Sequence, residues 1–109
     1  MVNMSFLNTS RSGSVRNVIF QENGEWFGVA LEFNIVETGD SPQEVMMLLD
    51  SAIKGYVESA DKSSLSISVL NQDIDPEYES LWNSNGTIEN QGDKKIYSIT
   101  TQPLSALAL

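Results

Sequence analysis

The sequence contains neither cysteine nor histidine. Without cysteine the chain has no disulfide framework, no thiolate metal ligand and no cysteine nucleophile. Without histidine it lacks the commonest general base and the commonest zinc ligand. These absences exclude zinc hydrolases, serine–histidine hydrolases and cysteine proteases. Magnesium held by carboxylates and a serine–lysine pair remain open. Lys54 faces solvent by its helical phase and Lys62 lies in a connection, so neither is expected within reach of a serine in a pocket.

Cations are also scarce: the 109 residues include 6 Lys and Arg against 15 Asp and Glu, which gives a net charge of -9. Nonspecific binding to nucleic acid, or to an anionic membrane surface, depends on cations and is therefore disfavoured. The charge suits association with a basic partner, although it equally suits an ordinary acidic domain. With 40% hydrophobic residues, the composition predicts one globular domain.

Signals for export or membrane insertion are missing from the pattern as well. The first residues carry no basic n-region followed by an apolar stretch of secretory length. No run approaches the ~18 apolar residues typical of a membrane span. The sequence therefore predicts a cytoplasmic protein.

Three strands are predicted in the first third of the chain, over residues 15–20, 25–31 and 35–38. Asn23-Gly24 separates the first two, and this dipeptide is the strongest short-range signal for a hairpin. In the second strand the large residues Phe27, Val29 and Leu31 alternate with Trp26 and two small residues. We therefore expect the large apolar residues on the covered face of the sheet and Trp26 on the uncovered face.

A long helix is predicted to begin after Ser41. The sequence SPQE at residues 41–44 combines a capping serine, a proline at the first helical position and a glutamate three residues after the cap. Apolar residues then recur at intervals of three and four as far as Ala60, which is the pattern of a helix packed on a sheet. Gly55 beside this stripe is expected to permit close approach to the sheet.

The alternation of LSISV at residues 65–69 predicts a fourth strand, returning parallel to the first. The expected fold class is α+β: a two-layer β-β-β-α-β sheet of order 3-2-1-4 with one main helix on one face. A short helix from Pro76 and a weak hairpin pattern at 95–100 follow as an appendage. The expected organisation is a flexible arm at 1–14, a domain at 15–70 and an acidic extension at 71–109.

Residues 17–60 resemble the HicB-like antitoxin family. The resemblance is carried by WFGVA at 26–30, LEFNIV at 31–36, GDSPQE at 39–44 and AIKGYV at 52–57. It implies a partial RNase H-like fold without nuclease activity, an oligomeric state, and a function in binding and neutralising a small basic ribonuclease toxin. Many members also carry a C-terminal DNA-binding motif, but residues 71–109 contain no basic recognition helix.

For partner binding we single out Trp26, Glu32 and Glu37, since tryptophan is enriched at interface hot spots and the carboxylates suit a basic partner. The alternative for Trp26 is that Tyr78 and its helical neighbours cover it. An orphan oligomeric scaffold without a toxin is the alternative function.

No catalytic, metal-binding or cofactor-binding residue is predicted. The acidic run from Asp73 to Glu79 has Tyr78 and Ser84 where a calcium loop needs glycine and glutamate. A magnesium-dependent nuclease would need Glu32, Glu37 and Asp50 to converge, which nothing in the pattern requires.

Overall fold

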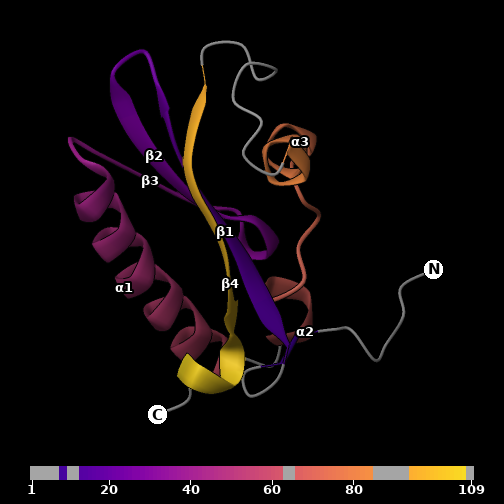
Figure 1. The fold of residues 1–109 in the computed structure, drawn as a ribbon. Helices are drawn as coiled ribbons and strands as arrows, with labels where there is room; N and C mark the ends of the chain where they lie inside the picture. The colour runs from indigo at the N-terminus through magenta and orange to yellow at the C-terminus, as the bar shows by residue number, and fades with distance from the viewer. Residues whose placement is uncertain (1–7, 10–12, 63–65, 85–93, 108–109) are drawn as a thin grey trace.

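The computed structural model describes residues 8–9, 13–62, 66–84 and 94–107, which form a four-stranded sheet with a helix against each face (Figure 1). The α+β fold class is confirmed. The strands are β1 (Ser14–Glu22), β2 (Glu25–Ala30), β3 (Ile35–Gly39) and β4 (Lys95–Pro103). The helices are α1 (Pro42–Asp61), the single turn α2 (Ser66–Val69) and α3 (Pro76–Ser84), with 3₁₀ turns η2 (Leu31–Phe33) and η4 (Leu104–Leu107).

Local signals place the first half of the fold correctly. Asn23 and Gly24 both have positive φ, 54° and 83°, as a tight hairpin turn between β1 and β2 requires. Asn34, with φ 55°, ends the η2 turn and leads into β3. The Ser41 hydroxyl accepts the backbone N–H of Glu44 at 3.1 Å, and the Glu44 carboxylate accepts that of Asp40 at 2.7 Å. The start of α1 is therefore capped as predicted.

The expected order of the first three strands is confirmed, but the fourth strand is a different segment. The observed order is β3-β2-β1-β4, and β4 pairs antiparallel with β1. Residues 66–69, expected in a parallel strand, form the helical turn α2, and residues 63–65 lie outside the described part. Leu70 is buried directly after this turn. Residues 95–103, expected in an appendage, complete the sheet instead.

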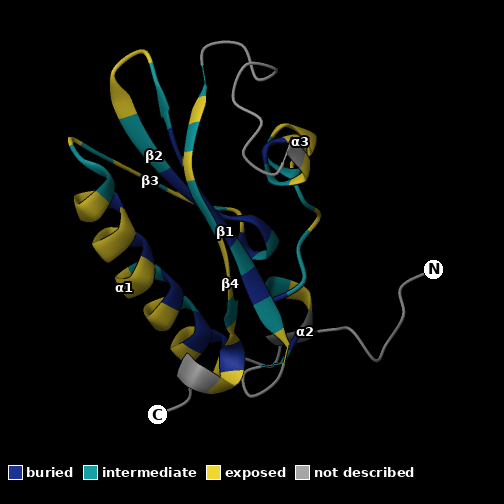
Figure 2. Ribbon diagram, viewed as in Figure 1, coloured by how far each residue is buried: buried dark blue, intermediate teal, exposed yellow. Residues whose placement is uncertain are grey.

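Helix α1 covers the opposite face of the sheet from the one expected. Trp26, Gly28 and Ala30 face α1, whose buried residues are Val45, Leu49, Ile53, Val57 and Ala60. Phe27, Val29 and Leu31 face away from α1 and share a second core with α3. The α3 residues in this core are Tyr78, Leu81 and Trp82. Both faces of the central strands are thus buried, which makes three layers where two were predicted (Figure 2).

Gly28, and not Gly55, is the glycine that lets α1 approach the sheet. A Cβ atom at Gly28 would lie 2.5 Å from Val45 Cγ1 and 3.1 Å from Ile19 Cδ1. A Cβ atom at Gly55 would have nothing within 4 Å, because Gly55 lies on the exposed side of the helix. A small residue is therefore needed at the middle of β2, directly under the first turns of α1.

Asn8 belongs to the folded unit. It is buried, its Nδ2 donates to the Leu70 carbonyl at 3.0 Å, and its Oδ1 accepts the backbone N–H of Ser14 at 2.8 Å. Asn71 Oδ1 accepts the Asn8 N–H at 2.7 Å. The flexible arm predicted for 1–14 is therefore wrong at Asn8, while residues 1–7 and 10–12 lie outside the described part. None of the helices in the described residues is long and apolar enough to cross a membrane.

Candidate functional site

The outer side of β3 forms an acidic sheet edge. In the described residues β3 pairs with β2 only, so its other side carries no strand. Glu37 lies in β3, Asp40 and Glu44 follow at the start of α1, and Glu25 begins β2 one residue beyond the Trp26–Gly39 pair. No described cation forms an ion pair with any of these four carboxylates. We call this set, together with β3, the β3 edge.

Trp26 lies beside the β3 edge. It is neither on an uncovered face nor covered by Tyr78 and its helical neighbours, which were the two predicted alternatives. It pairs with Gly39 across the sheet and is half-buried on the α1 face. Its ring meets that of Tyr97 edge-to-face, with centroids 5.6 Å apart. Tyr97 is the extra residue at the register shift in β4 and is itself 50% exposed. The α3 residues lie on the opposite face, so the prediction that they cover Trp26 is wrong.

Glu32 is separated from Trp26 and Glu37 and is engaged by Arg16. Its Oε2 accepts Arg16 Nε at 2.6 Å, and its Oε1 accepts the Arg16 backbone N–H at 2.8 Å. The same guanidinium donates to both oxygens of Glu79 at 3.0 and 3.2 Å and lies 5.4 Å from the ring of Trp82. Burial lowers the pKa of Arg16, but the hydrogen bonds to Glu79 and Glu32 outweigh it and leave the pKa raised. This network ties η2 to α3.

Lys94 forms a second bridge over the α3 face. Its ammonium lies 2.8 Å from Glu77 and 3.2 Å from Glu22, and the hydrogen bond to Glu77 is the main reason why its pKa is raised. Burial raises the pKa of the nearby Tyr78, since it disfavours the phenolate, and the charges of Glu77 and Asp75 add to this effect.

Both shifts predict loss of stability in alkali. The folded protein favours neutral Tyr78 and charged Lys94, so each contributes stability below its ordinary pKa, 10.0 and 10.5. That contribution disappears as the pH rises through the raised value. We expect the ultraviolet titration of tyrosinate to show a late component that Tyr78→Phe removes and Tyr97→Phe retains. Loss of the late component in Tyr97→Phe would contradict this assignment.

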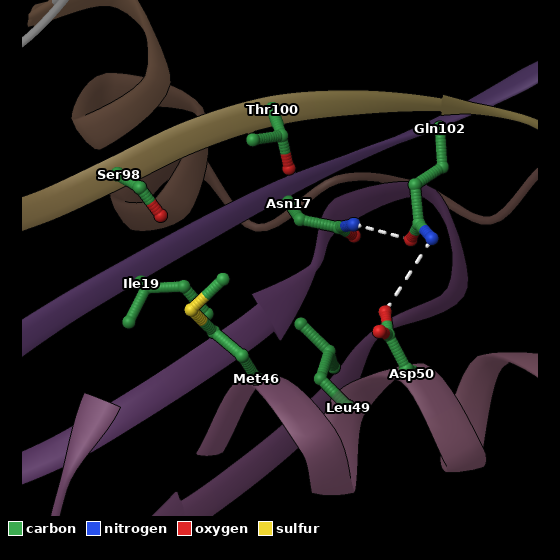
Figure 3. Close-up of a pocket in the computed structure, with 8 residues that line it drawn as sticks. All are labelled: Asn17, Ile19, Met46, Leu49, Asp50, Ser98, Thr100 and Gln102. Atoms are coloured by element: carbon green, nitrogen blue, oxygen red, sulfur yellow. Dashed lines mark hydrogen bonds between the residues drawn. The ribbon is translucent and has the colours of Figure 1, made fainter. Parts of the chain in front are cut away.

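A hollow opens between α1 and β4 (Figure 3). Helix α1 packs mainly against β2 and β3, so the β4 side of this face stays open. The cavity volume is about 210 Å³. Its lining residues come from β1, α1 and β4 and are Asn17, Ile19, Met46, Leu49, Asp50, Ser98, Thr100 and Gln102. We call it the α1–β4 hollow.

Asn17 is the buried polar group of this hollow. It is 5% exposed, and its Nδ2 donates to Gln102 Oε1 at 2.6 Å. Its Oδ1 has no hydrogen-bond partner in the described part of the chain. An unsatisfied buried acceptor costs roughly 1–3 kcal/mol, so Asn17 Oδ1 is suited to accept a hydrogen bond from a water or a ligand.

The three predicted partner-binding residues are therefore not all together. Trp26 and Glu37 share the α1 face at the β2–β3 side of the sheet, as their pairing partners Gly39 and Gly28 show. Glu32 lies in η2, in the Arg16 network. Among the described residues no group of three or more acidic side chains is placed to hold a metal ion. Sequence reasoning missed the roles of Arg16 and Asn17, whose partners lie up to 85 residues away along the chain.

Comparison with known proteins adds no relative: no protein-family model, curated protein or solved structure matches this chain.

Proposed function

We propose that this chain is a non-enzymatic, cytoplasmic protein-binding module of the HicB-like antitoxin type. Its role is to neutralise a small basic ribonuclease by covering that protein's RNA-binding surface. The observation that carries the proposal is the β3 edge, a strand whose outer side has no partner among the described strands and is flanked by carboxylates that no described cation neutralises. The segment from β1 to α1 has the β-β-β-α order predicted from the sequence, which supports the proposal.

The backbone of β3 suits addition of a strand from a partner. An edge strand presents N–H and C=O groups in a row, and an extended segment that pairs with them gains main-chain hydrogen bonds. Val36, 43% exposed, supplies an apolar contact on one face of β3. Glu37 and the half-buried Trp26 lie on the other face. The result is an apolar surface rimmed by acid.

Charge determines which partner this edge favours. A basic segment is drawn to Glu37, Asp40 and Glu44, and association is accelerated at low ionic strength. A ribonuclease that binds RNA through cations has the complementary surface. Glu32 does not belong to this interface in the proposal, because Arg16 already engages both of its oxygens.

The test is co-expression of the full chain with the basic reading frame next to its gene. We expect growth to be rescued from the partner's toxicity and the two proteins to co-purify. Glu37→Lys should weaken binding about ten-fold or more, because a like-charge contact replaces an attractive one. Glu58→Lys, the same change at an exposed position of α1 away from the β3 edge, should bind normally. Absence of binding to either neighbouring product would overturn the proposal.

The same proposal denies catalysis to the chain itself. Purified protein should leave labelled RNA intact in the presence of Mg²⁺. Cleavage that disappears in Glu32→Ala would establish a nuclease instead. Glu32, Glu37 and Asp50 lie in η2, β3 and α1 respectively, and they do not form a metal-binding group.

An oligomeric scaffold is the second candidate, and β4 is the observation that favours it. Residues 94–107 contain two lysines and no acid, in a chain with 15 acidic residues. β4 pairs with β1 only among the described strands, so its outer edge is also open. Pairing of two β4 strands would join copies where they carry the least negative charge. If no partner binds, a dimer mass in light scattering would favour this candidate over the antitoxin.

A further inference from the structure

The α1–β4 hollow has the features of a small-ligand site that is separate from the β3 edge. Taking about 30 Å³ for each water molecule, its 210 Å³ corresponds to roughly seven waters. On this side β4 presents Ser98, Thr100 and Gln102, where a closed core would have apolar side chains. The hollow is therefore bordered by polar side chains of β4 on one side and by α1 on the other.

The hydrogen bonds in the hollow leave acceptors unused. Asn17 Nδ2 donates to Gln102 Oε1, and Gln102 Nε2 donates to Asp50 Oδ1 at 3.4 Å (Figure 3). Each side-chain amide thus donates to the next acceptor, and this series of hydrogen bonds ends at the Asp50 carboxylate. Asn17 Oδ1, on a side chain about 95% buried, is left without a partner. Asp50 is exposed and forms no ion pair with a described residue.

The other wall of the hollow is apolar. Ile19 from β1 and Leu49 from α1 are buried, and Met46, 40% exposed, lies one turn before Asp50 on the same helix (Figure 3). Thioether side chains adapt their shape to an incoming aliphatic group. A ligand that fits here carries N–H donors at one end and a short apolar chain at the other.

We propose that the α1–β4 hollow binds an alkylammonium group. The ammonium donates to the Asp50 carboxylate and, after a shift of the buried Asn17 amide toward the hollow, to Asn17 Oδ1. Its methylene groups lie against Met46 and Leu49. A carboxylate or phosphate ligand is excluded, because it would add acceptors and negative charge beside Asp50. Lys54 borders an adjoining depression with Asp50 and Gln102 but does not neutralise Asp50 through an ion pair. The proposal does not depend on the antitoxin function.

Nuclear magnetic resonance of the full-length ¹⁵N-labelled chain tests this site. Titration with n-butylammonium chloride should shift the side-chain amide signals of Asn17 and Gln102, with saturation at a Kd of about 1–10 mM for so small a ligand. Tetramethylammonium chloride, which has the charge but no N–H donor, should cause no saturable shift. N-acetyl-lysine methylamide distinguishes the source: binding equal to that of butylammonium identifies a partner's lysine side chain, and weaker binding identifies a free amine.

Two variants show whether the named groups make the site. Asp50→Asn should weaken butylammonium binding about ten-fold or more, as expected for loss of a charge-assisted hydrogen bond. Glu58→Gln removes the same charge elsewhere on α1 and should leave binding unchanged. Equal shifts with tetramethylammonium, no saturable shift with butylammonium, or an unchanged Kd in Asp50→Asn would each overturn the proposal.

Discussion

Gly28→Ala is expected to lower the free energy of unfolding by about 1–3 kcal/mol, the usual cost of overpacking a core. The new methyl group would lie 2.5 Å from Val45 Cγ1, a separation that forces α1 away from the sheet or Val45 out of its rotamer. Because valine has a strongly preferred χ1 rotamer, a change of the Val45 rotamer also costs free energy. Val45 is fully buried, and any shift is passed on to Leu49 and Ile19. Denaturant unfolding followed by circular dichroism measures the change.

Gly55→Ala is the matched control, with the opposite sign expected. Gly55 is an exposed position inside α1, and a Cβ atom there meets nothing within 4 Å. Replacing glycine by alanine in a helix interior stabilises by about 0.5–1 kcal/mol, because the unfolded chain loses freedom. If Gly28→Ala were as stable as the wild type, or Gly55→Ala were the more damaging variant, the position assigned to α1 over β2 would be wrong.

Neighbouring residues predicted the local features of the fold, but not which face of β2 contacts α1. The hairpin at Asn23-Gly24, the cap at Ser41 and the start of α3 at Pro76 were all predicted, because each depends on residues a few positions apart. Which face of β2 receives α1 depends instead on long-range packing. Large residues line one face of β2 and small ones the other, and the pattern alone favoured the large face. In the structure α1 packs on the face with the small residues, because Gly28 allows its close approach.

The fourth strand was missed for a related reason. The alternation at residues 65–69 spans only five residues, too short to separate a strand from a helical turn. The real strand, β4, has a weaker pattern, because one of its faces opens onto the α1–β4 hollow and carries Ser98 and Thr100. The same difference between local and long-range signals applies to the candidate site residues. Glu37 and Trp26 were singled out by residue type and stay a prediction, while the contacts of Asn17 and Arg16 arise only from partners brought near by the sheet and α3.

Arg16→Met is expected to lower the free energy of unfolding by about 2 kcal/mol. Loss of one partner of a buried ion pair costs roughly 3–5 kcal/mol, but this network is only partly buried. The side chains of Arg16, Glu32 and Glu79 are 23%, 18% and 35% exposed, so solvent screens part of the interaction. Methionine retains most of the aliphatic length and leaves two facing carboxylates without their cation. The contact of the guanidinium with Trp82 is lost as well.

Two comparisons separate the network from a general loss of positive charge. Lys54→Met removes a cation from an exposed position that forms no ion pair with a described residue, and should change stability by less than about 0.5 kcal/mol. In the Arg16→Met background, Glu79→Gln should restore part of the loss, since it removes one of the two facing charges. In the wild type the same Glu79→Gln change should destabilise, because it breaks a bidentate pair. If Glu79→Gln had the same effect in both backgrounds, Arg16 and Glu79 would be energetically independent, and the bridge from η2 to α3 would contribute nothing to stability.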